Sequence, residues 1–395
     1  MRSAPNAVDT HNAVAAHDAQ TNALVALVAE GQSIWLDFIS RDLVRGGQLR
    51  RLIEQDGLRG MTSNPSIFQK AIAAGDAYDE QLAQLAAEGR TAGEIFEALS
   101  VQDVRDACDL FRPLYDQTAG LDGVVSIEVS PSVAHDADGT LIEARRLWAS
   151  VDRPNVLIKV AATDAGIEAI EELTARGVSV NVTLLFSLSR YEQAIDAYLD
   201  GLERRAAAGE PLSGISSVAS FFVSRVDGAV DPQLEPDSRL RGRVAIANAQ
   251  RAYARYLGTF GTSRWRRLQA LGARPQRPLW ASVATKDDSY SDVRYVQELV
   301  ARHVISTMPL KTLHAFANHG DIGSPLGSDA RVAEHLIGQL AAAGIDFVAL
   351  TDGLERRGVE AFRDSYRQLL GSIEERIASL TAEVPGELVG QGVGS

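Results

Sequence analysis

The chain has 395 residues, of which 45% are hydrophobic and 23% charged, as is ordinary for a globular protein with a large core. Its net charge of −13 argues against nucleic acid as the main partner, because phosphate backbones are bound by basic surfaces. No apolar run has the length of a membrane span, and the first residues lack the apolar region of a signal peptide. We therefore expect a cytoplasmic protein with no membrane partner. The single cysteine, Cys108, excludes an internal disulfide and is expected to fill the core.

Eight short apolar runs alternate with longer amphipathic segments between a polar tail, predicted over residues 1–21, and a frayed end, predicted over 386–395. Several of these runs are continuously apolar, which is typical of parallel strands covered on both faces. The runs are SIWLDFI (33–39), GMTSN (60–64), GVVSIEV (123–129), NVLIKVA (155–161), VSVNVTLLF (178–186), ISSVASFFV (215–223), PLWASVA (278–284) and HVISTMP (303–309).

The segments between the runs have helical patterns. Residues 100–118 carry an apolar stripe with Ser100 as the expected N-cap and Asp103 three residues later, and residues 164–177 begin at Asp164 and stop at Gly177. An α/β alternation that reaches eight strands predicts a single (β/α)8 TIM barrel over residues 22–385. The rival is a doubly wound open sheet, which is weakened because no GxGxxG pattern follows the first strand.

Two segments break the alternation. Residues 227–241 are polar and contain two prolines, so we expect a long surface loop there. From His314 onward the pattern is helical only, which predicts additional C-terminal helices. These helices would either lie over the mouth of the barrel or form an oligomer contact, and the sequence is compatible with a monomer or a homodimer.

Lys159 stands in the middle of an apolar run. The chain has only four lysines, and the other 35 of its 39 basic residues are arginine. Arginine stays protonated, whereas a desolvated lysine can lose its proton and act as a nucleophile. The plain alternative is a lysine at a strand end that reaches water, and this segment alone leaves both readings open.

Other polar residues occur inside the apolar runs or at their ends. In a barrel these side chains would gather at the carboxyl ends of the strands, where active sites form. Asp37 and Glu128 lie among apolar neighbours and need partners if they are buried. An amine beside two carboxylates suits carbonyl chemistry, because the amine forms an imine while one acid moves the protons of the released water and the other drives C–C cleavage. Amides and hydroxyls would hold sugar hydroxyls, and Arg225 suits a phosphate.

Two segments resemble known signatures of the transaldolase family. MTSNPSIF, from Met61, resembles the first signature, and the segment from Pro154 through NVLIKVAATDAG resembles the one that bears the Schiff-base lysine. The likeness extends from about Ser33 to Pro309 and is similar to the long bacterial branch of the family. The resemblance implies a single-domain barrel with the lysine on the fourth strand.

The resemblance also implies roles for individual residues. Lys159 would be the Schiff-base nucleophile, Asp37 the acid/base of C–C cleavage, and Glu128 the group that handles the catalytic water with the help of Thr183. The implied substrate-binding residues are Asn64, Asn181 and Ser220 for the dihydroxyacetone portion, Arg225 and Ser282 for phosphate, and Phe222, where related fructose-6-phosphate aldolases have a tyrosine. Ala284 replaces the second phosphate arginine of the better-known branch, and Lys286 is the candidate substitute.

The expected function is therefore transaldolase activity in the pentose phosphate pathway. A dihydroxyacetone unit would pass from sedoheptulose 7-phosphate or fructose 6-phosphate to glyceraldehyde 3-phosphate or erythrose 4-phosphate, with no cofactor. No residue cluster has metal-ligand spacing, so no metal is expected. The alternatives are an aldolase that releases free dihydroxyacetone and a sugar-phosphate-binding barrel without catalysis.

Overall fold

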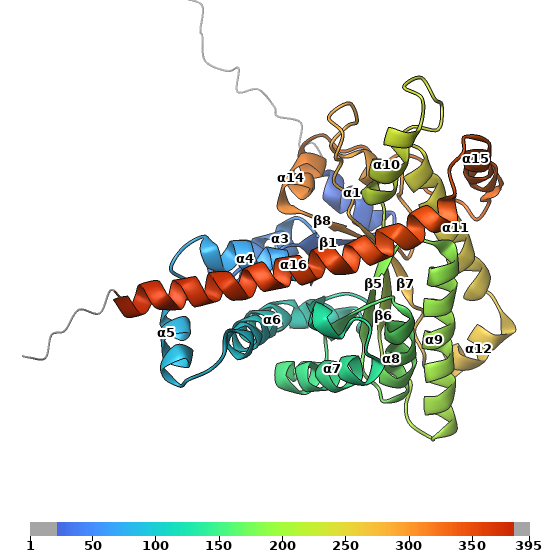
Figure 1. Cartoon of the computed structure of the whole chain (residues 1–395). Helices are drawn as coiled ribbons and strands as arrows, with labels where there is room; N and C mark the ends of the chain where they lie inside the picture. The colour runs from blue at the N-terminus through green and yellow to red at the C-terminus, as the bar shows by residue number, and fades with distance from the viewer. Residues whose placement is uncertain (1–21, 383–395) are drawn as a thin grey trace, which may run out of the picture.

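Eight parallel strands form a closed barrel in the order β1 to β8 in a computed structural model that describes residues 22–382 (Figure 1). The predicted tail over 1–21 and the predicted frayed end over 386–395 lie outside the described residues. The closed barrel confirms the predicted fold and excludes the open sheet. The strands are β1 (Ser33–Asp37), β2 (Leu58–Thr62), β3 (Val124–Glu128), β4 (Val156–Ala161), β5 (Val180–Leu185), β6 (Ser217–Phe222), β7 (Arg277–Ala281) and β8 (Ile305–Met308).

Each of the eight apolar runs overlaps one strand. Strands β5 and β6 are buried at every position, and β4 at all but its last. The inner face of the sheet is closed within the barrel, and helices cover its outer face (Figure 1). Both faces are therefore buried, which explains why the apolar runs are continuous. Cys108 lies in this core at 0% exposure, as expected, and burial raises the pKa of its thiol.

The helices lie mainly between successive strands and after the last one. Their bounds are α1 (Ala23–Ala29), α2 (Arg41–Arg45), α3 (Gln48–Gln55), α4 (Pro65–Ala73), α5 (Asp79–Ala87), α6 (Ala92–Gln117), η1 (Pro131–Val133), α7 (Ala137–Val151), α8 (Asp164–Ala175), α9 (Leu188–Ala207), α10 (Ser224–Val230), η2 (Asp231–Gln233), α11 (Val244–Thr259), α12 (Ser263–Ala270), α13 (Arg294–Gln297), α14 (Leu310–His319), α15 (Arg331–Ala342) and α16 (Phe347–Ala382). Helix α8 begins at Asp164, as predicted.

The predicted start of the helix at Ser100 is wrong. Helix α6 begins at Ala92, after Thr91, whose hydroxyl accepts a hydrogen bond from the backbone N–H of Glu94 while the Glu94 carboxylate accepts one from the backbone N–H of Thr91. This reciprocal capping box satisfies the first free N–H groups of the helix. Ser100 lies inside the helix and donates to the carbonyl of Glu97 at 3.0 Å.

The prediction of a surface loop over residues 227–241 is wrong for its first part. Helices α10 and η2 occupy that part, and two of its carboxylates are buried. Asp227 accepts hydrogen bonds from the backbone N–H of Ala245 at 2.7 Å and from the hydroxyl of Tyr295 at 2.9 Å, and Asp231 accepts one from the hydroxyl of Tyr290 at 2.8 Å. These partners are distant in sequence, so local polarity gave no sign of burial.

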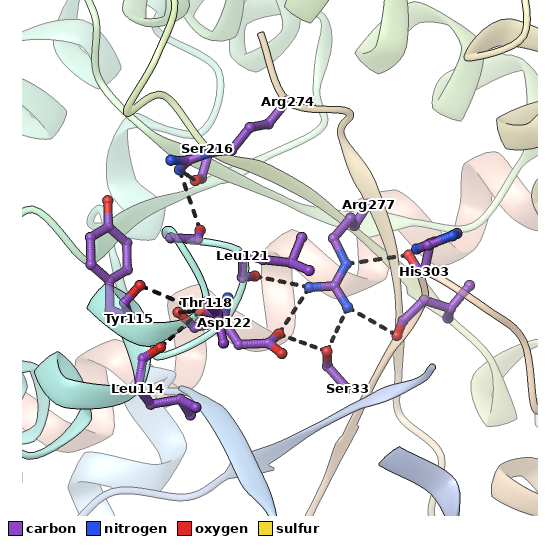
Figure 2. A network of polar contacts seen from close by, with 12 residues as sticks. Ser33, Leu114, Tyr115, Thr118, Leu121, Asp122, Ser216, Arg274, Arg277 and His303 are labelled. Atoms are coloured by element: carbon purple, nitrogen blue, oxygen red, sulfur yellow. Dashed lines mark hydrogen bonds and ion pairs between the residues drawn. The ribbon is translucent and has the colours of Figure 1, made fainter. Parts of the chain in front are cut away.

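A polar network closes the amino-terminal end of the barrel (Figure 2). Arg277, the first residue of β7, is 5% exposed and donates to Asp122 Oδ1 at 3.0 Å and to Ser33 Oγ at 2.6 Å. It also donates to the backbone carbonyls of Leu121, His303 and Val304. One guanidinium therefore connects the segments that lead into β1, β3, β7 and β8, at the end of the barrel opposite to the strand carboxyl ends.

The last helix, α16, runs across the molecule in front of the strands (Figure 1) and packs on α4, α6 and β5. A Cβ at Gly358 of α16 would lie 3.0 Å from Leu184 of β5. This arrangement favours the first of the two expected placements, over the barrel mouth. Within residues 22–382 no single helix has the length and composition of a membrane span, although α15 and α16 meet those criteria together as a pair bent by 94°.

Candidate active site

A cavity of about 480 Å³ opens at the carboxyl ends of the strands. Nine of the eleven predicted site residues line it: Asp37, Asn64, Lys159, Thr183, Ser220, Phe222, Arg225, Ser282 and Lys286. The two that do not line it are Glu128, which lies beside Lys159 and lines a neighbouring cavity of about 270 Å³, and Asn181, which is hydrogen-bonded to Ser220. The cavity also includes side chains without a predicted role, among them Thr62, Lys70, Thr307 and Phe362.

Lys159 lies on β4 and is 5% exposed, so the alternative in which it reaches water does not apply. Its ammonium nitrogen lies 3.4 Å from Glu128 Oε2 and donates to the backbone carbonyl of Ser63 at 3.3 Å. The ring of Phe362, from α16, is centred 5.6 Å from the same nitrogen. The amine is thus largely buried, has one acidic partner, and borders the cavity.

Glu128 is the last residue of β3, and the parallel register of β3 and β4 places it beside Lys159. Burial raises the pKa of the Glu128 carboxyl to about 7, an effect that the Lys159 charge opposes and the Asp37 charge increases. Glu128 can therefore give or take a proton near neutral pH, which an exposed glutamate does poorly.

Asp37 is the last residue of β1 and faces the cavity. Its Oδ1 accepts a hydrogen bond from Thr62 Oγ1 at 2.8 Å, and Thr62 in turn lies 2.9 Å from Thr307 Oγ1. The two threonines come from β2 and β8, the strands on either side of β1. Thr62 thus contacts the Asp37 carboxylate directly, and Thr307 contacts the Thr62 hydroxyl, a role that sequence reasoning did not assign to either threonine.

Thr183, on β5, lines the cavity, and its hydroxyl oxygen is buried without a hydrogen-bond partner among residues 22–382. A buried hydroxyl that is left unpaired is costly, so this oxygen is suited to a molecule that enters the cavity. The next residue, Leu184, has φ of 62°, an unusual backbone conformation for a branched residue.

Asn181, also on β5, is fully buried, and its amide is used within the protein. Its Nδ2 donates to Ser126 Oγ at 3.0 Å, and its Oδ1 accepts from Ser220 Oγ at 2.7 Å. Asn64 caps helix α4, where its Oδ1 accepts from the backbone N–H of Ile67 at 3.1 Å. The amide nitrogen of Asn64 takes no part in that bond, so a donor remains at the cavity.

The far side of the cavity carries the groups expected to bind phosphate. Arg225 lies over the ring of Phe222 at 5.2 Å, and burial lowers the pKa of its guanidinium while the Asp37 charge opposes that shift. Ser282 follows β7 with φ of 55°, and its hydroxyl lies 2.9 Å from Ser224 Oγ. Lys286 is exposed at the rim. Residues with strained backbone conformations, such as Ser282, cluster at ligand sites, and here one lies near the half-buried Arg225.

Sequence reasoning missed three features of the site: the carbonyl of Ser63, the pair of Thr62 and Thr307, and Phe362. A sequence does not reveal backbone contacts or partners hundreds of residues away. The rarity of lysine in this chain was the one feature of the sequence that could have pointed to Lys70. Among residues 22–382 no group of three His, Cys, Asp or Glu side chains is arranged to hold a metal ion.

Comparisons with known proteins agree with the geometry. Residues 34–373 match the family model described as transaldolase/fructose-6-phosphate aldolase. The chain is 49% identical to a transaldolase of Frankia alni over 90% of its own length and 98% of that protein. It is 48% identical to a transaldolase of Mycolicibacterium smegmatis and 47% identical to transaldolase 2 of Streptomyces coelicolor, in both cases over 91% of this chain and 98% of the relative.

Proposed function

The chain belongs to the transaldolase/fructose-6-phosphate aldolase family, and on this premise we propose how its cavity carries out the reaction. The activity is that of a transaldolase, a transferase that acts on sugar phosphates. The observation that supports the proposal most directly is the buried amine of Lys159, with Glu128 at 3.4 Å on one side and the cavity on the other.

In the first step Glu128 accepts a proton from Lys159, and the resulting amine attacks the C2 carbonyl of a ketose phosphate. The carbinolamine then loses its hydroxyl as water, with a proton supplied by Glu128, and leaves an iminium ion joined to Lys159. The raised pKa of Glu128, about 7, suits this exchange because the group is available in both protonation states. Thr183, whose hydroxyl is otherwise unpaired among the described residues, would hold the water.

In the second step Asp37 removes the proton of the C4 hydroxyl. The C3–C4 bond breaks, its electrons move to the iminium nitrogen to give an enamine, and the aldose phosphate leaves. A second aldose phosphate then accepts the enamine carbon by the reverse path, and water releases the new ketose. The hydrogen bond from Thr62 at 2.8 Å keeps the Asp37 carboxylate at the cavity wall.

Binding of the substrate is divided between the two ends of the cavity. Asn64 and Ser220 would hold the hydroxyls of the dihydroxyacetone portion, while Asn181 acts through its bond to Ser220 and so positions it. Arg225 and Ser282 would hold the phosphate, and the exposed Lys286 is the candidate for the place that Ala284 leaves without an arginine.

Transfer, rather than release of free dihydroxyacetone, is favoured by the apolar surroundings of the enamine. Phe222 lines the cavity and packs on Phe186 with ring centroids 5.2 Å apart, and Phe362 borders Lys159. An apolar wall keeps water from protonating the enamine carbon. Assays with and without an aldehyde acceptor separate the two activities: a transaldolase turns over only when the acceptor is present.

Borohydride reduction in the presence of fructose 6-phosphate tests the central step. The expected product is a stable secondary amine at Lys159, found by mass mapping of the peptide that spans β4. An unmodified peptide in the fully active enzyme would refute the mechanism. We also place the enzyme in the cytoplasm and the pentose phosphate pathway, and sedimentation would distinguish the proposed monomer and homodimer.

A further inference from the structure

Three of the four lysines of this chain, Lys70, Lys159 and Lys286, line one cavity, whereas the other 35 basic residues of the chain are arginine. Imine chemistry accounts for Lys159, and Lys286 is already a candidate for phosphate binding. Lys70 has no part in the function proposed above. Its presence in the cavity therefore needs its own explanation.

Lys70 lies in the last turn of α4, the helix that follows β2. It shares the cavity-lining face of that helix with Ser66 and Ile67, which precede it by four and three positions. In a closed barrel of eight strands β2 lies opposite β6, so Lys70 faces the cavity from the side across from Arg225. The helix dipole favours a cation in a last turn, but it does not explain why this one is exposed at the cavity.

The charges of the cavity are strongly one-sided. Apart from Lys159, which is paired with Glu128, its lining includes three cations, Lys70, Arg225 and Lys286, and a single acid, Asp37. Within residues 22–382 neither Lys70 nor Lys286 has an acidic side chain within ion-pair distance. The whole chain carries −13, which repels anions. A cleft of one charge sign in such a protein concentrates ligands of the opposite sign and raises their rate of association.

We propose that Lys70 recruits the phosphate of the incoming sugar phosphate at the rim of the cavity, together with Lys286, before Arg225 and Ser282 hold it. This inference rests on the proposed function and adds a binding residue to it. Lysine suits the task because its point charge on a flexible four-carbon stem can follow a moving phosphate, whereas the planar arginine fork fits a fixed one. The step governs capture of the substrate and not the chemistry that follows.

The test measures the acceptor half-reaction at saturating fructose 6-phosphate. Lys70→Gln should lower kcat/KM for glyceraldehyde 3-phosphate by about three- to tenfold at low ionic strength, as expected for the loss of one charge near a dianion. It should leave kcat unchanged, and it should leave kcat/KM for unphosphorylated glyceraldehyde unchanged. The difference in kcat/KM between the wild type and Lys70→Gln for the phosphorylated acceptor should become smaller at about 0.5 M salt, because salt screens the charge. Lys70→Arg keeps the charge but not the flexible point charge, so its kcat/KM should lie between those of Lys70→Gln and the wild type.

Lys311 provides the matched control, because it is an exposed lysine on α14 that does not line the cavity. Lys311→Gln changes the net charge equally and should behave as wild type. The proposal is overturned if Lys70→Gln and Lys311→Gln have the same kcat/KM for glyceraldehyde 3-phosphate. It is also overturned if Lys70→Gln lowers kcat/KM equally for the phosphorylated and the unphosphorylated acceptor. Borohydride trapping distinguishes a failure of this proposal from a failure of the mechanism. If Lys159 is trapped but Lys70→Gln shows no selective loss of kcat/KM for the phosphorylated acceptor, only the role of Lys70 is refuted.

Discussion

Lys159 and Glu128 form a buried ion pair, and burial raises the pKa of the Glu128 carboxyl. Desolvation disfavours every charged form, and the 3.4 Å separation lets each group stabilise the charge of the other. With the pKa of Glu128 raised to about 7, the amine has a neighbour that can accept a proton at neutral pH. Reactivity at this residue therefore comes from burial and register together.

Replacement of Lys159 by arginine should remove the reaction and keep the fold. A guanidinium retains the charge beside Glu128 but cannot form an imine, so turnover should fall by at least roughly 10³-fold. The measurements are the coupled transfer assay and the mass of the hydride-trapped peptide. Lys311→Arg makes the same substitution outside the cavity and should trap normally; substantial turnover in Lys159→Arg would reassign the nucleophile.

Replacement of Glu128 by glutamine should slow imine formation by about 10²–10⁴-fold, because the proton donor for water loss is removed. Binding of a sugar-alcohol phosphate, which cannot form an imine, should change little. In the wild type the rate of trapping should change with a midpoint near pH 7, from Glu128, and this dependence should be absent in the variant. Rapid-quench trapping and calorimetry measure the two quantities, and an equal loss of both would make Glu128 a binding residue.

At the scale of the strands, parallel register turns residues far apart in sequence into neighbours. Glu128 pairs with Lys159 between β3 and β4, and Asp37 pairs with Thr62 between β1 and β2. The sequence predicted the strands, because continuous apolar runs mark buried parallel strands, and it predicted that polar strand ends would gather. It did not predict the register or Thr307 of β8, since neither leaves a local pattern.

Helix limits were harder to predict than strands. Both Thr91 and Ser100 precede an acidic residue by three positions, and only tertiary structure decides that Thr91 caps α6. Asp103, the expected partner of Ser100, instead pairs with Arg41 at 3.0 Å in the interior. The burial of Asp227 and Asp231 could not be predicted for the same reason. The sequence around a polar residue does not show whether it is exposed to solvent or buried with a hydrogen-bonding partner.

The network at the amino-terminal end of the barrel should contribute to stability and not to catalysis. Arg277→Met leaves the Asp122 carboxylate buried without its cation and should lower the free energy of unfolding by about 3–5 kcal/mol. Adding Asp122→Asn should recover part of the loss. Urea denaturation measures both, and kcat of the folded enzyme should stay unchanged, because the active site lies at the other end of the barrel.

Arg264 is the matched control for this prediction. It also pairs with several carboxylates, Asp196, Asp200 and Glu203, but its side chain is 30% exposed. Arg264→Met should cost only about 1 kcal/mol or less, as is usual for solvated ion pairs. Equal losses for Arg264→Met and Arg277→Met would contradict the assignment of stability to the buried network.

For the molecule as a whole, helix α16 and the charge distribution act on the same site. The helix crosses the barrel mouth and brings Phe362 to 5.6 Å from the Lys159 nitrogen, so residues more than 200 positions from the lysine segment help to keep it dry. The sequence predicted helices at this end but not which of their residues would reach the site. Their stripe of apolar residues suits contact with a barrel as well as contact with a second chain.

The pH dependence of stability follows from carboxyl groups in opposite environments. Burial raises the pKa of Glu128 to about 7 and that of Asp227 to about 6, above the value of about 4 in the unfolded chain. Between pH 5 and 7 the folded protein therefore binds more protons than the unfolded chain, and the free energy of unfolding should fall as pH rises, by on the order of 1 kcal/mol per group and pH unit. Asp227→Asn should make this slope shallower in urea titrations. The control is Asp329→Asn, which should leave the slope unchanged, because hydrogen bonds from Arg331 lower the pKa of this exposed carboxyl to about 2. A free energy of unfolding that rises between pH 5 and 7 in the wild type would contradict the argument.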